Sequence, residues 1–161
     1  MSARVPRKPA SVLMEYISLP PVSIPEPDCK RLRHIVRQAA ADRHPVAAFL
    51  ASELLRANIL LSHELPADTV ELDRWVTFRP DRGWQSERRL LVCPQDYHSA
   101  ELHLSVLSPL GAALIGLRVG SQIPYRSIEG VMHVACVESI GASKIEAGPA
   151  YQPNRKKGGE S

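Results

Sequence analysis

The spacing of apolar residues changes once along this sequence, from a helical period to the alternating period of β-strands. Before the change, apolar residues recur every three or four positions in two runs, 28–41 and 45–61, separated by the turn Asp42-Arg43-His44. Asp28 can cap the first helix, and Pro45 suits the first turn of the second because its missing N–H leaves no bond unmade there. So short a connection predicts two antiparallel helices that pack side by side as a short coiled coil.

Beyond residue 65 the apolar residues alternate with polar ones, as they do in half-buried β-strands. One helix interrupts these strands, because Ser108 can cap a helix whose first residue is Pro109. The pattern predicts an α+β fold, with a short N-terminal antiparallel helical hairpin over 28–64 and, over 65–148, an antiparallel sheet domain with one short helix. The expected strands are 74–79, 87–93, 102–107, 121–126 and 131–138.

Charge is unevenly distributed along the chain. The formal net charge is +3 over 161 residues, yet segment 65–140 has more acidic than basic residues. A protein that binds duplex nucleic acid through its phosphates needs a basic surface on its folded part, so we expect nucleic-acid contact to be indirect or weak. The Pro-rich segment 1–27 is expected to be a disordered extension, and segment 149–161 a flexible basic tail.

Several classes of protein do not fit the sequence. No apolar run approaches the ~20 residues of a membrane span, and the first residues lack the apolar stretch of a secretory signal, so we expect a cytoplasmic protein without membrane contact. Cys29, Cys93 and Cys136 are odd in number and form no C-x-x-C pair, which disfavours disulfides and zinc sites and favours buried thiols. No phosphate-binding loop or nucleophile motif is present, so the sequence predicts no catalytic residue, no metal and no cofactor.

The densest motif is the run S-V-L-S-P-L-G-A-A-L-I-G-L-R-V-G at 105–120. It resembles the signature of the C-terminal domain of the bacterial transcript-cleavage factors GreA and GreB. The resemblance is closest to their relatives in the regulator of nucleoside diphosphate kinase family, with the pattern S-V-x-x-P-V-G-A-A-L-L-G-L-R-V-G-D. Four other segments match this family in the expected order: A-S-E-L-L-R-A-N, W-V-T-F-R, L-V-C-P-Q-D and Y-Q-P. The resemblance therefore covers roughly 28–153.

The resemblance implies an FKBP-like C-terminal domain that binds RNA polymerase at the rim of its secondary channel, with the hairpin occupying or partly blocking that channel. At Ser121 this chain departs from its relatives, which usually have an acid there, so a charge contact at that turn is not carried over. The implied polymerase-docking surface consists of Ser108, Pro109, Leu110, Ala112, Ala113, Leu114, Gly116 and Gly120.

The Gre factors place paired acids at the tip of their coiled coil, where these acids help the polymerase to hold a second Mg²⁺ for transcript cleavage. The corresponding turn here, Asp42, Arg43 and His44, has a single acid, whereas such a metal needs several convergent oxygens. We therefore expect a non-catalytic regulator that binds polymerase and competes with the Gre factors. We also expect the protein to be a monomer.

Two other functions stay open on the sequence. FKBP-like architecture suggests a peptidyl-prolyl isomerase, although a fold alone confers no activity and two Phe and four Tyr promise little aromatic lining. The family name suggests direct action on nucleoside diphosphate kinase, which the sequence does not separate from polymerase binding.

Three weaker features have simpler structural explanations. His98 and His103 lack a third ligand at zinc spacing and are expected to be exposed. A solvated face explains Arg82, Arg88 and Arg89 better than an acidic partner does. Trp75 and Trp84 are expected to pack in the core and hairpin rather than to stack on bases.

Overall fold

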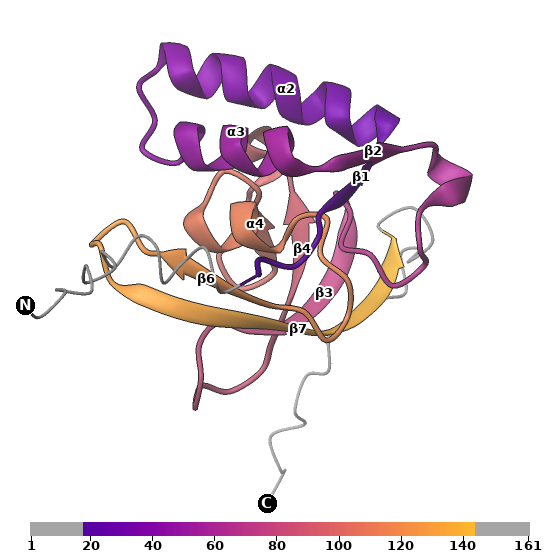
Figure 1. The fold of residues 1–161 in the computed structure, drawn as a ribbon. Coiled ribbons are helices and arrows are strands. Elements are labelled where there is room, and N and C mark those ends of the chain that lie inside the picture. Colours follow the sequence, from indigo (N-terminus) through magenta and orange to yellow (C-terminus); the bar gives the residue numbers. More distant parts are fainter. Residues whose placement is uncertain (1–17, 144–161) are drawn as a thin grey trace, which may run out of the picture.

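The computed structural model describes residues 18–143, which fold into a curled five-stranded sheet with three α-helices stacked over one of its faces (Figure 1). Two single-turn 3₁₀ helices lie in the loops, at Ser62–Glu64 and Pro94–Asp96. In chain order the main elements are β1 Ser23–Pro25, α2 Glu26–Ala41, α3 Ala47–Arg56, β2 Asn58–Leu60, β3 Arg74–Arg79, β4 Glu87–Val92, β5 His103–Ser105, α4 Pro109–Leu114, β6 Gln122–Arg126 and β7 Met132–Ser143.

The main sheet has the strand order β5-β4-β3-β7-β6. Its long strand β7 pairs antiparallel with both β3 and β6, so it joins the two halves of the sheet. The expectation that all strands pair antiparallel is wrong at one edge of the sheet, because β5 pairs parallel to β4. The ten residues between these strands carry the chain back to the end of the sheet at which β4 began. A connection of that length removes the antiparallel pairing that a tight turn would impose.

The two N-terminal helices differ in extent from the expected ones. Helix α2 begins at Glu26, so Asp28 lies inside its first turn instead of capping it. Helix α3 ends at Arg56, five residues before the predicted end, because the chain then forms β2 and pairs in parallel with β1. Figure 1 shows α2 and α3 side by side above α4, with the turn between them at the edge of the molecule.

Residues 22–25 belong to the fold, and the prediction of a disordered extension is wrong for them. Val22 and Ile24 are fully buried, and the Ser23 amide donates a hydrogen bond to the Gly116 carbonyl at 3.0 Å. A Cβ at Gly116 would overlap the Val22 side chain, so glycine is required for this close approach. The prediction for residues 1–17 and that of a basic tail over 149–161 fall outside the described residues.

The buried apolar residues of helices and sheet form one cluster, which includes Leu32 of α2, Leu50 of α3, Ala113 of α4 and Phe78 of β3. The helix pair therefore shares the core of the sheet domain and does not form a separate arm. Of the predicted buried thiols, Cys29 and Cys93 lie in this core and Cys136 is half-buried. The FKBP-like description of the domain stays a prediction.

None of the helices within 18–143 is long and apolar enough to cross a membrane.

A polar cluster ties the start of α2 to the sheet. The Asp28 carboxylate accepts a hydrogen bond from the Leu72 amide at 3.3 Å, and Arg31 Nη1 donates to Asp73 Oδ2 at 3.0 Å. A second guanidinium nitrogen of Arg31 lies 3.2 Å from Cys93 Sγ, at the end of β4. Burial raises the pKa of Asp28 to about 6, although Arg31 and the Leu72 amide both act to lower it.

Replacing this carboxylate should change how stability depends on pH. The pKa of Asp28 is about 6 in the folded chain, against an ordinary value of 3.8, so folding favours the protonated carboxyl group. The stability that this group contributes is fully present below pH 3.8 and is lost as the pH rises through 6. The free energy of unfolding of Asp28→Asn should equal that of the wild type near pH 4 and exceed it by about 1–2 kcal/mol at pH 7.5, a figure that allows for solvent screening of this partly exposed group.

Urea unfolding at half-unit pH steps from 4 to 7.5 measures this difference. Asp42→Asn, an exposed carboxylate in the turn after α2, controls for the general effect of removing one charge. A difference between Asp28→Asn and wild type that stays constant over this range would contradict the prediction.

Candidate protein-docking site

Helix α4 begins as the sequence predicted. Ser108 Oγ accepts a hydrogen bond from the Gly111 amide at 3.0 Å and donates one to the Ser105 carbonyl at 2.6 Å. Pro109 follows in the first turn, where no N–H is needed. Together these bonds fix the loop between β5 and α4 and leave Ser108, Pro109 and Leu110 half-buried at the surface.

The rest of the implied docking surface lies inside the protein. Ala112, Ala113 and Leu114 are fully buried, and Gly116 is buried against Val22. Helix α4 lies between the sheet and the α2–α3 pair, so its small residues allow close packing within the chain itself. These four residues therefore present no surface to a partner in this fold, whereas Gly120 is exposed in the turn before β6.

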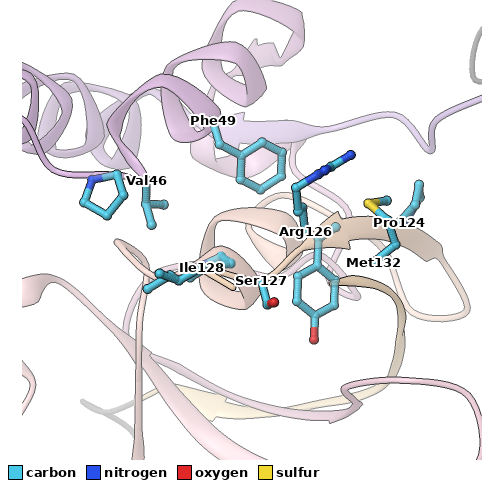
Figure 2. A pocket seen from close by; sticks show the side chains of 10 residues that line it. Val46, Phe49, Pro124, Arg126, Ser127, Ile128 and Met132 are labelled. Atoms are coloured by element: carbon cyan, nitrogen blue, oxygen red, sulfur yellow. The ribbon is translucent and has the colours of Figure 1, made fainter. Parts of the chain in front are cut away.

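An apolar groove opens beside Pro109, where the start of α3 faces the β6–β7 hairpin. Its volume is about 410 Å³, and Figure 2 shows Phe49 on the helix side opposite Arg126 and Ile128. A second hollow of about 260 Å³ shares Pro109, Tyr125, Ser127 and Ile128 with it and adds Ser108 and Leu110. The groove is lined by Pro45, Val46, Phe49, Pro109, Pro124, Tyr125, Arg126, Ser127, Ile128 and Met132.

The groove ends at the β6–β7 turn, which exposes three apolar side chains. Ile128 is 68% exposed, Val131 53% and Met132 44%. The turn itself is well defined, because the Ser127 and Val131 backbones pair at 2.9 Å and Gly130 takes the positive φ of 85° that closes it. Apolar side chains gathered on a well-defined turn beside a groove are typical of a protein-interaction surface.

A partly buried hydrogen-bond network holds Tyr125 in the wall of the groove. The Tyr125 hydroxyl donates to the Pro80 carbonyl at 2.8 Å, and its ring stacks on His133 with centroids 5.3 Å apart. His133 Nδ1 lies 2.7 Å from Asp81 Oδ2. Hydrogen bonds from the Val134 amide, His133 and the Arg82 amide lower the pKa of Asp81 to about 2, and burial raises the pKa of Tyr125 to about 12. Tyr125 therefore keeps its proton near neutral pH and serves as a fixed wall.

The predicted hairpin tip turns back onto the domain. Arg43 has a positive φ of 54°, and His44 Nδ1 accepts a hydrogen bond from the Val46 amide at 3.1 Å. Asp42 and His44 share a hollow with Pro94, Gln95 and Leu107 of the sheet domain. Within 18–143 no group of three or more His, Cys, Asp or Glu side chains is placed to hold a metal ion.

Local contacts account for most of the histidines, arginines and tryptophans that the sequence singled out. The His98 amide donates a hydrogen bond to His103 Nδ1 at 3.0 Å, so the His103 imidazole holds the loop before β5 in place. Arg88 lies over the Trp75 ring at 5.5 Å, and Arg89 pairs with Glu87 at 3.5 Å. The prediction that Trp84 packs is wrong, because the β3–β4 loop leaves it 60% exposed.

Sequence reasoning missed the groove residues from α3 and the β6–β7 turn. The apolar period over 45–61 does not distinguish Phe49, which lines the groove, from residues that only fill the core, and no motif marks Ile128, Val131 or Met132. The segment I-E-G-V-M at 128–132 carried the usable signal, because three apolar residues around one glycine are unusual for a turn.

Known proteins match most of the chain. Residues 65–140 match the family profile described as "Transcription elongation factor, GreA/GreB, C-term", and residues 20–60 match "Rnk N-terminus". The regulator of nucleoside diphosphate kinase of Escherichia coli strain K12 is 36% identical over 115 residues, which are 71% of this chain and 85% of that protein. GreA of Thermotoga neapolitana is 34% identical over 71 residues, 44% of this chain and 46% of that protein.

A solved structure has a similar fold. The transcription elongation factor GreA/GreB from Nitrosomonas europaea superposes with a TM-score of 0.61 at 26% identity, over 75% of this chain and 99% of that one. The mixed α+β architecture with a curled five-stranded sheet is thus consistent with the fold of the GreA/GreB C-terminal domain.

The structure separates core residues of α4 from groove residues by their effect on stability. Ala113→Trp adds a large side chain where no space exists, so it should destabilise the protein by several kcal/mol or prevent folding. Ile128→Asp changes an exposed side chain and should alter stability by less than about 0.5 kcal/mol. Chemical denaturation of both variants measures this contrast, and an Ala113→Trp protein as stable as wild type would contradict it.

Proposed function

The chain belongs to the regulator of nucleoside diphosphate kinase family, relatives of the GreA/GreB elongation factors, and from this membership we propose that it is a non-catalytic transcription regulator that binds RNA polymerase. Its docking position would lie near the secondary channel, as the family resemblance implies, and there it would compete with the Gre factors.

The observation that carries this proposal is the apolar groove beside Pro109. The family signature supplies Pro109 to its wall and Ser108 and Leu110 to the adjoining hollow, while the β6–β7 turn supplies exposed apolar side chains. Apolar side chains of a polymerase helix would fill such a groove and remove this surface from water. Arg126 lies in the lining and offers a charge contact to an acidic residue of the same helix.

The burial of α4 changes the docking surface that the sequence implied. Ala112, Ala113, Leu114 and Gly116 support the groove from within the core, so they position the contact residues without touching the partner. The proposed contact residues are Pro109, Leu110, Phe49, Ile128 and Met132, which come from three parts of the sequence.

A direct action on nucleoside diphosphate kinase is the second candidate, because the relative from E. coli carries that kinase in its name. The same groove could receive the kinase, so binding measurements with both proteins separate the candidates. Peptidyl-prolyl isomerase activity is a third reading, since Phe49 and Tyr125 give the groove two aromatic rings. A proline-peptide isomerisation assay on the full chain tests it.

The groove proposal predicts which exposed apolar residue matters. Ile128→Asp should weaken binding to core RNA polymerase at least tenfold, about 1.4 kcal/mol, because a carboxylate would be buried in an apolar contact. Leu55→Asp is the matched control, since Leu55 is 88% exposed on α3 and does not line the groove.

Fluorescence anisotropy of the labelled full chain, titrated with core polymerase, measures both affinities. Equal losses in the two variants would move the interface away from the groove. Tighter binding to nucleoside diphosphate kinase than to polymerase would favour the second candidate.

The turn at Asp42 leads to a prediction about transcript cleavage. The protein should not stimulate cleavage in arrested elongation complexes, because the tip offers one acid and lies against its own sheet domain. It should nevertheless reduce Gre-stimulated cleavage by competing for polymerase. Gel analysis of labelled transcripts measures both effects, and rapid cleavage that disappears in Asp42→Ala would overturn this prediction.

A further inference from the structure

The solvent face of α2 carries positive charge that the described part of the chain does not neutralise. Lys30, Arg33 and Arg37 are all exposed there, and within residues 18–143 none of them forms an ion pair. We call these three residues the α2 basic face. Six other arginines do pair with carboxylates, one of them on α2 itself: Arg31, Arg56, Arg74, Arg79, Arg89 and Arg118.

Folding of α2 does not account for this face. The spacings from Lys30 to Arg33 and from Arg33 to Arg37 bring like charges together on one side of the helix, and such pairs are destabilising. The last turn of α2, where the helix dipole would favour cations, contains none. Glu26, four residues before Lys30, offsets this repulsion at one end only, so the helix itself gains little from Arg33 and Arg37.

The length of the face limits its partner. From Lys30 to Arg37 the helix rises by about 10 Å. Acidic residues stand beyond both ends, Glu26 in the first turn and Asp42 after the last. A nucleic-acid backbone that follows this face would also meet Glu26, one turn before Lys30, whereas a short acidic segment would meet only the cations.

We propose that the α2 basic face contacts a short acidic segment of the surface of RNA polymerase, a second contact in addition to the groove. This inference rests on the proposed function. Carboxylates spaced three and four residues apart on a partner helix would match Lys30, Arg33 and Arg37, and each guanidinium can bind a carboxylate through two N–H groups.

The position of α2 suits this role. Figure 1 shows it outermost in the stack, with α3 between it and α4, so a partner can approach it without disturbing the core. Exposed charges of this kind act mainly on association, because they attract an oppositely charged surface before contact forms. The basic face should thus govern how fast the complex forms, and the groove how long it lasts.

The test measures association and dissociation rates of the full chain with core RNA polymerase at 50, 150 and 300 mM salt. Arg33→Glu/Arg37→Glu should lower the association rate about tenfold at 50 mM and change the dissociation rate less than about twofold. The difference should shrink towards 300 mM as screening increases. The single variant Arg33→Glu is measured as well, and Arg82→Glu is its matched control, since Arg82 is exposed on the β3–β4 loop and not on α2.

Circular dichroism verifies the fold of each variant, and Arg33→Gln/Arg37→Gln, which removes charge without reversing it, should give an intermediate rate. Unchanged association rates in both double variants, with binding still weakened at least tenfold in Ile128→Asp, would overturn this inference and leave the proposed function intact. Absence of polymerase binding by the wild type would instead refute the proposed function.

A 20-nucleotide RNA serves as the competing probe. Binding of this RNA by the wild type at 150 mM salt, lost in Arg33→Glu/Arg37→Glu, would assign the face to nucleic acid and overturn the acidic-surface proposal.

Discussion

The burial of α4 is the constraint on which the rest of the structure depends. A Cβ at Gly111 would overlap the Ser105 carbonyl and one at Gly116 would overlap Val22, so only glycine permits the observed packing at both ends of the helix. With Ala112 and Ala113 between them, α4 is thin enough to lie between the sheet and the α2–α3 pair. Because the helices can then approach the sheet closely, one core forms from both halves of the chain.

The same packing places the groove. Pro109 lies where α4 emerges from the core, and the start of α3 and the β6–β7 hairpin converge on it. The fixed backbone of the β6–β7 turn and the Tyr125 hydroxyl bond hold two of its walls. A groove built from rigid elements loses little conformational entropy when a partner binds, which favours its use as a docking site.

Local patterns predicted the elements that local forces determine. The Ser108 cap, the Pro109 start and the strand Arg74–Arg79 follow from capping chemistry and alternation, and the structure confirms them. The strand Ser23–Pro25, and the parallel pairing of the strand that was expected at 102–107, depend on contacts between separate segments, which periodicity does not reveal. For the same reason the signature at 105–120 suggested a surface where small residues in fact fill the core, and the groove, assembled from three distant segments, was missed.

The shared core also limits how this protein could act on a polymerase. Helix α2, about 24 Å long by its 16 residues, lies along the domain and does not project from it. To extend the turn at Asp42 into a channel, the helix pair would have to leave the domain and expose Leu32, Val46 and Leu50, which are now buried. Exposure costs ~1.5–3 kcal/mol for each such side chain, a sum comparable to the whole stability of many domains. A regulator with this architecture would therefore exclude competitors by occupying their docking position, with its helix pair in place over the core.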